Sequence, residues 1–419
     1  MRLSLFLRPS RFTLASIAAL GLAGCQARDS QVTGPPPTKS EGTSSDLLST
    51  TPSFGEPFAE LSAADLARFA AGKVEFQAVE TVAEGLGPVF NEASCASCHS
   101  GPVGGTNFRL ETRFGRTRAN GTFDPMTEFG GSLLQDRGIG FVGAPAGPHT
   151  FNAEVVPAEA TVIARRLTTP LFGLGLVDAV PDEELLRLAQ IEAESDPETG
   201  GTPNLVREIR TNRTRVGRFG WKAQVPTLFQ FSGDAYLNEM GITSPEFPSE
   251  NCPQGDCAAL KFNPFPALND DGTAVVKFTD FMTLLAPPPR GPNAEEESDG
   301  TELFASVGCS ACHTPMLKTG ESPVEALSQK RFHPFSDFLL HDMGSLGDGI
   351  EQSKATGRLM RTAPLWGVRS RTRLLHDGRA TTLEAAILAH DGQGRKARDR
   401  FQALDAEAKL ALLAYLKSL

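Results

Sequence analysis

Two Cys-x-x-Cys-His pentapeptides constrain this chain of 419 residues more than any other feature. The first spans residues 95–99 and reads Cys-Ala-Ser-Cys-His, and the second spans residues 309–313 and reads Cys-Ser-Ala-Cys-His. Two thiols at this spacing can each add to a haem vinyl group, and the adjoining histidine can bind the iron. A four-cysteine zinc site would leave both histidines without a role, and a thioredoxin-like dithiol expects a βαβ context and no second copy. The chain is therefore predicted to hold two covalently bound haem c groups through Cys95, Cys98, His99, Cys309, Cys312 and His313.

The sequence around the two pentapeptides also repeats. Phe90 and Phe304 each lie five residues before the first cysteine of a pentapeptide. A Thr-x-Pro-Leu-aromatic-Gly pattern follows at 168–173 in the first half and at 362–367 in the second. A shared order of motifs with unequal spacing indicates a tandem duplication of one haem domain.

Helix signals dominate the rest of the chain. Acidic residues at 182–184 precede an apolar run, and Asp405 precedes an amphipathic segment that reaches Leu419. Strand-like alternation is scarce. We therefore expect a mostly α fold of two tandem cytochrome c-like haem domains with long loops.

The N-terminal segment has the features of an export signal. Three arginines precede an apolar run at residues 14–24 that is too short to span a bilayer. Residues 22–25 read Leu-Ala-Gly-Cys, which resembles the bacterial lipobox, whose cysteine receives lipid chains and becomes the mature N-terminus. The resemblance implies a signal peptide at 1–24, lipidation of Cys25 and a location on the periplasmic side of a bacterial membrane, with Gln26 favouring the outer membrane. The alternative is an ordinary secretory signal with a chance cysteine.

Two segments of biased composition set the predicted domain boundaries. Residues 25–56 are rich in Pro, Ser, Thr and Gly and have too little apolar surface to fold alone, so they read as a disordered tether. Residues 286–297 combine several prolines with an acidic run and read as a linker. The predicted N-terminal haem domain, with insertions, is 57–295, and the C-terminal haem domain is 296–419.

Cys252 and Cys257 remain after the pentapeptides and the lipid site are assigned. The four residues between them include Pro253 and Gly255. In an exported protein this pair favours a small structural disulfide that closes a loop, and the alternative is a redox-active dithiol.

The charge balance excludes one class of partner. Lys and Arg total 40 against 50 Asp and Glu, which gives a net charge of −10 at pH 7. Binding to a phosphate backbone needs clustered cations, so we expect no nucleic-acid partner.

His390 is the first candidate for a second iron ligand. It lies seven residues after Leu383 and three after Ile387, so it shares their apolar helical face. A histidine on such a face is either a core residue bonded to a carbonyl or a ligand of the iron. The spacing alone leaves both interpretations open.

Part of the second half resembles the C-terminal haem domain of the bacterial di-haem cytochrome c peroxidase superfamily. The similar segments are 364–367, which reads Pro-Leu-Trp-Gly, and 375–384, which begins Leu-His-Asp-Gly-Arg. In that superfamily the second axial ligand, often Met or Tyr, follows fourteen residues after the histidine of a His-Asp-Gly turn. His390 lies fourteen residues after His376, so the resemblance implies that His313 and His390 ligate the second iron.

The resemblance extends over roughly residues 80–419 and points to the di-haem oxidoreductase branch of the superfamily. Members of this branch are predicted peroxidases and are also labelled thiol oxidoreductases. Met343 lies in one of the similar segments and is the alternative to His390, because methionine is a common ligand of high-potential haem. The segments that carry this resemblance are 85–91, 170–181, 217–223, 238–243 and 340–344.

The resemblance also implies a distal glutamate near the N-terminal haem, where it would move a proton between the two peroxide oxygens. The first half lacks a His-Asp-Gly-Arg turn, and residues 176–184 are taken as its counterpart. Glu183, Glu184 and His149 are the candidate catalytic residues. The alternatives are that the two acids stabilise a helix start and that His149 is a solvated loop residue.

Trp221 is the candidate electron relay between the irons, although buried packing is the commoner role of tryptophan. Together these features predict an exported, lipid-anchored di-haem c-type oxidoreductase that reduces a peroxide at its N-terminal haem. Its expected partner is a periplasmic electron donor or acceptor such as a small cytochrome. The alternative is a non-enzymatic electron-transfer protein in which both irons are six-coordinate.

Overall fold

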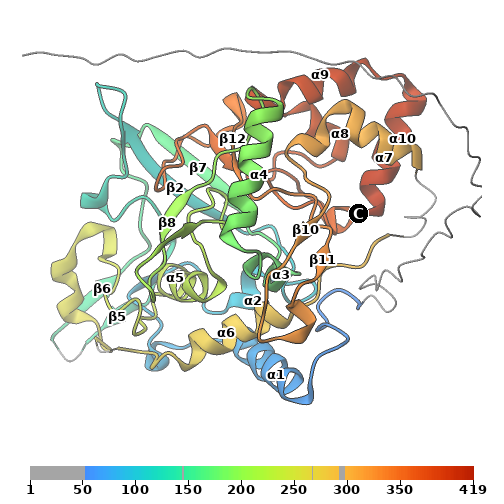
Figure 1. The fold of residues 1–419 in the computed structure, drawn as a ribbon. Helices are drawn as coiled ribbons and strands as arrows, with labels where there is room; N and C mark the ends of the chain where they lie inside the picture. Colours follow the sequence, from blue (N-terminus) through green and yellow to red (C-terminus); the bar gives the residue numbers. More distant parts are fainter. Residues whose placement is uncertain (1–51, 144–145, 267, 292–297) are drawn as a thin grey trace, which may run out of the picture. The chain divides into compact units, whose positions relative to one another are not determined.

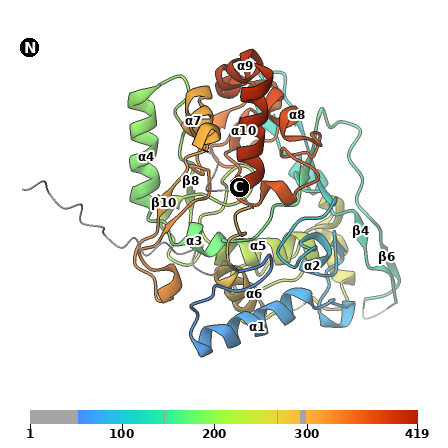
Figure 2. The ribbon, with the colours of Figure 1, turned by 90° about the vertical axis from the view of Figure 1, so that its right-hand side faces the viewer.

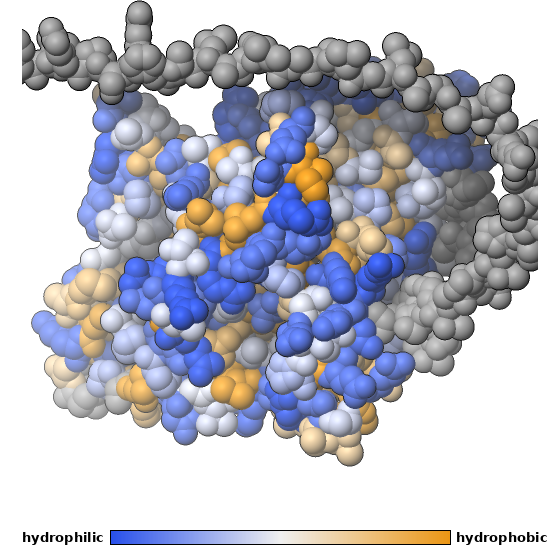
Figure 3. Space-filling view, in the orientation of Figure 1, coloured by the Kyte–Doolittle hydropathy of each residue, from blue (hydrophilic) through white to orange (hydrophobic). Residues whose placement is uncertain are grey.

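The computed structural model describes residues 52–143, 146–266, 268–291 and 298–419. The predicted signal peptide, the lipidation site Cys25 and most of the predicted tether lie outside the described residues. Among the described helices, none has both the length and the apolar character needed to cross a bilayer. The face drawn in Figure 3 is largely hydrophilic, with hydrophobic residues in small groups.

One group of helices packs around the first pentapeptide. The longest of them begins after Ser62, whose side-chain oxygen accepts a hydrogen bond from the Asp65 amide. This helix crosses a later one closely at Gly72, where a Cβ atom would collide with the carbonyl oxygen of Lys277. The rings of Phe76 and Phe281 pack against each other in the contact, tilted by 39°, with centroids 4.8 Å apart. The group consists of α1 (Ala63–Gln77), α2 (Cys95–Cys98), α3 (Leu174–Asp178), α5 (Leu228–Met240) and α6 (Thr273–Leu284).

A second group of helices packs around the second pentapeptide. The predicted C-terminal helix is confirmed: it begins after Asp405, whose carboxylate accepts a hydrogen bond from the Ala408 amide. Its buried residues Leu412, Tyr415 and Leu416 pack on Phe304 and Phe401. Figures 1 and 2 show the two groups on opposite sides of the folded part that the structure describes. This second group consists of α7 (Ser298–Val307), α8 (Leu383–Leu388), α9 (Arg395–Ala403) and α10 (Ala406–Ser418).

The expectation of a mostly α fold is only partly confirmed, because within the described residues short strands form six antiparallel sheets between and beside the helices. Most strands have two or three residues, too few for period-two alternation to be visible in the sequence. The longest pair, β2 with β7, contains arginines that form ion pairs, so its residues do not alternate regularly between apolar and polar. The strands are β1 (Val89–Phe90) with β4 (Arg137–Gly138); β3 (Phe123–Asp124), β2 (Leu110–Thr117) and β7 (Val162–Leu167); β5 (Gly140–Val142) with β6 (His149–Phe151); β8 (Leu205–Arg207) with β9 (Thr214–Val216); β10 (Leu317–Lys318) with β11 (Arg331–Phe332); and β12 (Leu340–Asp342) with β13 (Leu359–Arg361).

The helix predicted from residue 182 is also confirmed as α4 (Asp182–Ser195). Asp182 at its start is bound by Arg215 and Arg218 as well as lying at the positive end of the helix. The structure joins Cys252 to Cys257 in a disulfide, with Cα atoms 4.4 Å apart. The domain boundary near residue 295 stays a prediction, and residues 292–297 lie outside the described residues.

Candidate functional site

The residues predicted to hold the second haem line one cavity of about 270 Å³. Cys309 and Cys312 enter it from a short 3₁₀ turn, and His313 follows directly. His390 follows α8, whose N-cap Thr382 fixes where the helix starts. The imidazole rings of His313 and His390 lie close together, with centroids 6.4 Å apart and planes at 57°. An ion bonded to one nitrogen of each ring at about 2 Å would separate the centroids by roughly 6 Å, so the observed spacing fits a shared iron.

Hydrogen bonds fix which nitrogen of each ring is free. The Nδ1 atom of His313 lies 3.0 Å from the carbonyl oxygen of Phe335, and the Nδ1 atom of His390 lies 2.8 Å from that of Ala386. Because a carbonyl only accepts, both Nδ1 atoms carry the proton and both Nε2 atoms keep a lone pair. Burial lowers the pKa of His313 to about 4 and also lowers the pKa of His390, so both rings are neutral at pH 7. Met343 lines the same cavity and remains the alternative ligand.

Two arginines in this cavity carry charge without an acidic partner. In the described chain, neither Arg361 nor Arg371 forms an ion pair, and their bonds go to backbone carbonyls, among them those of Gly220 and Pro364. Burial lowers the pKa of each guanidinium to about 10. Buried cations are normally paired, so these two groups fit an anion such as a haem propionate.

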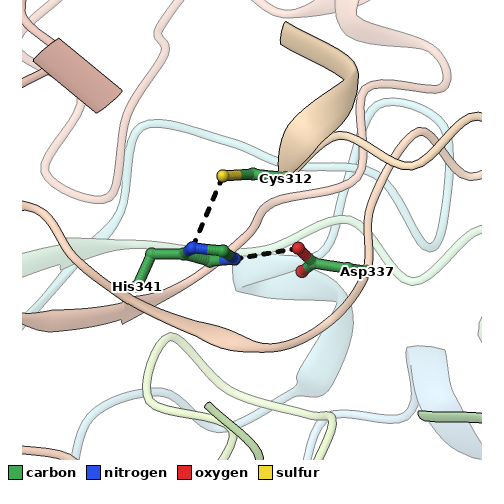
Figure 4. Close-up of side chains that lie close together, drawn as sticks. All are labelled: Cys312, Asp337 and His341. Atoms are coloured by element: carbon green, nitrogen blue, oxygen red, sulfur yellow. Dashed lines mark hydrogen bonds and ion pairs between the residues drawn. The ribbon is translucent and has the colours of Figure 1, made fainter. Parts of the chain in front are cut away.

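Cys312 also belongs to a close cluster of three possible metal ligands with Asp337 and His341 (Figure 4). The Nε2 atom of His341 lies 2.8 Å from Asp337 Oδ2, and its Nδ1 atom lies 3.0 Å from the Thr199 carbonyl oxygen and 3.4 Å from Cys312 Sγ. Burial opposes charge on the ring, but the Asp337 carboxylate outweighs it and raises the pKa of His341 well above its ordinary value. In the described structure this cluster is therefore a buried ion pair between His341 and Asp337 beside the pentapeptide.

The first pentapeptide lines a separate cavity of about 170 Å³. Cys95 and Cys98 lie on α2, and His99 caps that helix. Burial lowers the pKa of His99 to about 4, so this imidazole is also neutral at pH 7. Helix α5 also lines this cavity, with Phe231, Ala235 and Glu239 among its lining residues.

The two halves can be aligned at the turn and the N-cap that precede α5 and α8. Thr227 caps α5 as Thr382 caps α8, and each threonine is followed by leucine. An antiparallel β-bridge precedes each threonine at the same spacing. It joins the residue eight positions before the threonine to the residue two positions before it: Phe219 to Val225 in the first half, and Leu374 to Ala380 in the second. His390 lies eight residues after Thr382, and the residue eight after Thr227 is Ala235. The first cavity therefore has a methyl group where the second has an imidazole.

This alignment corrects the sequence interpretation of the first half. The counterpart of the His-Asp-Gly-Arg turn is the segment 219–227, not residues 176–184. The choice of residues 176–184 as the counterpart had led to the candidate acids Glu183 and Glu184. Both lie on α4, where Glu183 is exposed and Glu184 pairs with Arg187 at 2.7 Å. His149 lies in β6 and stacks on Phe262, with ring centroids 4.6 Å apart. None of the three candidates is among the residues that line either described cavity.

Glu239 is the acidic residue that the sequence analysis missed. Its Oε2 atom accepts a hydrogen bond of 2.7 Å from the Asn91 side-chain amide, and the Asn91 oxygen in turn accepts one from the Asp136 amide. Burial, reinforced by the charge of Glu111, raises the pKa of Glu239 to about 7. Asp234, on the same helix, has its pKa raised to about 6 by burial. A carboxyl group that exchanges its proton near neutral pH is suited to acid–base catalysis.

Trp221 lies in the wall that the two cavities share, because it is among the residues lining both. Its Nε1 atom donates a hydrogen bond of 2.9 Å to the Leu167 carbonyl oxygen. Trp366, by contrast, is buried in the first hydrophobic core and packs on Phe332. The structure thus places the predicted relay residue between the two candidate haem sites.

Comparison with known proteins identifies the family. The sequence model of the family described as "Di-haem oxidoreductase, putative peroxidase" matches residues 153–419. The chain belongs to this di-haem oxidoreductase family. Among curated proteins, nothing matches the chain. The match covers the second pentapeptide, α5 and Trp221 of this di-haem oxidoreductase, and the first pentapeptide precedes it.

Several solved structures are similar to the di-haem oxidoreductase at low identity. Hydrazine synthase of Kuenenia stuttgartiensis has a TM-score of 0.39 and 15% identity, covering 95% of this chain and 100% of that one. A MauG-like protein associated with microbial copper homeostasis has a TM-score of 0.38 and 15% identity, over 88% and 93% of the two chains. A variant of the diheme peroxidase BthA from Burkholderia thailandensis has a TM-score of 0.36 and 14% identity, over 84% and 85%. Likenesses at these TM-scores add nothing to the family assignment.

Proposed function

We propose that this di-haem oxidoreductase is an exported, lipid-anchored protein that reduces a peroxide at its N-terminal haem. The proposal rests on one comparison of the two halves: Ala235 occupies the position, eight residues after the N-cap threonine, that His390 occupies in the second half. His313 and His390 would together hold the second iron, which suits electron transfer. His99 would hold the first iron, and Ala235 offers no nitrogen to it, so a small oxidant could bind there.

Residues of both pentapeptides would hold the haems. The four cysteines would form thioether bonds, His99 would bind the first iron, and His313 with His390 would bind the second. Arg361 and Arg371 would bind propionates of the second haem. The halves would be the cytochrome c-like domains 57–295 and 296–419, and Cys25 would carry the lipid that holds them at the periplasmic side of the membrane.

The haem groups supply the redox chemistry, and the chain supplies the proton transfer. Reducing hydrogen peroxide to two molecules of water takes two electrons and two protons. Glu239 would accept the proton from the first peroxide oxygen and deliver it to the second; its position in the lining of the first cavity and its pKa of about 7 support this role. Asn91 orients this carboxylate through the hydrogen bond of 2.7 Å.

Electrons would enter from a small periplasmic donor at the second haem and cross the shared wall through Trp221. Trp221 and Phe231 are aromatic residues that line both described cavities. Electron flow from the second haem to the first would give the haems different tasks. This agrees with the different residues, His390 and Ala235, at the matching positions of the two sites.

Electron paramagnetic resonance of the oxidised, haem-loaded protein tests the proposal. We expect two haems per chain, one low-spin signal from the bis-histidine site, one high-spin signal from the N-terminal site, and haem that stays on the chain during denaturing electrophoresis. Peroxide consumption with a reduced cytochrome as donor is the accompanying assay. Two low-spin signals in both the oxidised and half-reduced protein, with no peroxide turnover, would instead establish the electron-transfer alternative.

A further inference from the structure

Lys222, next to the proposed relay residue, is fully buried, which is rare for a lysine. Its ammonium group pairs with Asp348 Oδ1 at 2.8 Å and donates to the carbonyl oxygens of Leu359 at 2.7 Å and Thr356 at 3.0 Å. The Gly357 carbonyl oxygen lies at 3.4 Å. An ammonium group has three N–H donors, and here each of them has a close oxygen. All four oxygens, which we call the 348–359 cage, come from the second half of the chain.

The cage is itself held in place. Asp348, 1% exposed, also pairs with Arg166 at 2.7 Å, and Arg166 donates to the Gln352 side chain at 2.6 Å. Arg166 lies in β7 of the first half and is 3% exposed. One carboxylate therefore joins two buried cations of the first half to a loop of the second half.

The short segment around Trp221 is docked onto the second half at further points. The Arg361 amide donates to the Trp221 carbonyl oxygen at 2.9 Å, and Arg361 Nε donates to the Gly220 carbonyl oxygen at 2.7 Å. Within the first half, the Asn204 side chain donates to the Lys222 carbonyl oxygen at 2.9 Å. Among the described contacts of the segment around Trp221, only the Lys222 side chain binds the oxygens of the 348–359 cage.

We infer that Lys222 is a positioning residue, whose ammonium group in the 348–359 cage fixes the Trp221 ring in the wall between the two haem sites. This inference rests on the proposed function in so far as Trp221 relays electrons. Without the ammonium group, Asp348 keeps only Arg166 as a cationic partner, and the three carbonyl oxygens lose the donor that joins them to the first half. The segment then loses its buried side-chain attachment to the second half. The Trp221 ring would then sample positions away from the wall.

Lys222→Met tests the inference, because methionine keeps a long unbranched chain and removes the charge. The matched control is Lys318→Met, which removes an exposed lysine from β10. We would measure the rate of electron transfer between the haems after photolysis of carbon monoxide from the half-reduced, full-length protein. We expect the Lys222→Met rate to fall by at least about tenfold while the control keeps the parent rate.

A second readout reports the ring itself and needs neither peroxide nor electron transfer. The chain has two tryptophans, so Trp366→Phe leaves Trp221 as the only indole. Haem quenches a nearby indole, and we expect the emission lifetime of Trp221 to lengthen in Lys222→Met but not in the control. A lower melting temperature with unchanged rate and lifetime would show a merely structural role and overturn the inference.

Asp348→Asn keeps the inference testable if Lys222→Met fails to fold. This variant keeps the lysine and its three carbonyl acceptors and removes the anion, so we expect changes in the same direction but smaller. Parent-like rate and lifetime in this folded variant would also contradict the inference. If the parent protein shows no electron transfer between haems, the proposed function fails, whereas the lifetimes still decide whether Lys222 positions Trp221.

Discussion

The rings of Trp221 and His376 meet edge to face, with centroids 6.2 Å apart and planes at 72°. The two residues also occupy matching positions of the two halves. Trp221 lies six residues before Thr227, and His376 lies six residues before Thr382. The duplicated turns are therefore in contact with one another, and each brings a different aromatic ring to the contact. The two candidate haem sites are neighbours through this pair.

Ala235→His should close the first site. The substitution places an imidazole at the position that His390 occupies in the second half, so we expect a six-coordinate, low-spin iron and loss of peroxide turnover. Electron paramagnetic resonance would show the high-spin signal replaced by a second low-spin signal. Ala235→Leu adds bulk without a nitrogen and should keep the high-spin signal; if both variants keep it, residue 235 does not face the iron.

Glu239→Gln should abolish most of the turnover without loss of haem. A positioned proton carrier contributes about 10²–10⁴-fold to a rate, so we expect kcat to fall within that range. The carboxylate form must accept the first proton, so parent kcat/KM should rise as the pH increases through about 7, and the variant should lack this rise. Glu183→Gln, on the exposed start of α4, should keep the parent rate and profile. Equal rates for parent and Glu239→Gln would rule Glu239 out as the acid–base residue.

His390→Met should raise the reduction potential of the second haem. Methionine opposite histidine stabilises ferrous iron, and axial ligands shift haem potentials within a range of roughly 0.8 V. Potentiometric titration followed in the visible spectrum measures this shift. Met343→Leu distinguishes the two candidates: the potential should stay at the parent value if His390 is the ligand, whereas a large change in this variant would assign Met343.

Asp337→Asn should alter how stability depends on pH. In the parent protein the folded pKa of His341 is raised well above the unfolded value near 6.5. The ion pair thus stabilises the fold fully below about pH 6.5, and its contribution disappears as the pH rises through the raised folded pKa. Removing one partner of a buried pair costs about 3–5 kcal/mol, so we expect this loss at low pH and a smaller one at high pH.

Urea unfolding of parent and Asp337→Asn at a series of pH values measures that difference. Asp342→Asn is a suitable control, since Asp342 pairs with Arg358 on the surface. A difference between parent and Asp337→Asn that stays constant with pH would show that His341 is not protonated in the fold.

Spacings within short segments were enough to single out the pentapeptides as predicted haem attachment sites and to put His390 on an apolar helical face. The prediction that His390 is an iron ligand came from the family resemblance, because the spacing alone left its role open. The pentapeptides and the apolar face shared by Leu383, Ile387 and His390 can be recognised without knowing any contact between distant residues. The structure brings His390 to His313 as expected, although 77 positions separate them (390 minus 313).

Glu239 and Ala235 could not be predicted in the same way. The insertion between the first pentapeptide and its later motifs is longer than in the second half, which led to the wrong counterpart at 176–184. The one local signal was the repeated Thr-Leu pair at 227–228 and 382–383, which is too short to decide an alignment without the matching bridges. The pKa of Glu239 depends on burial and on Asn91, which is 148 residues away.

The first hydrophobic core has a consequence for any attempt to study one haem at a time. Leu317, Phe332, Phe338 and Trp366 from the later part of the chain belong to the same core as Phe76 and Phe281. A fragment ending at residue 291 would lack these apolar side chains and would expose their partners to water, at roughly 25 cal/mol for each Å². The two predicted haem domains are therefore not independent folding units, and a substitution in this shared core would alter the packing around both pentapeptides.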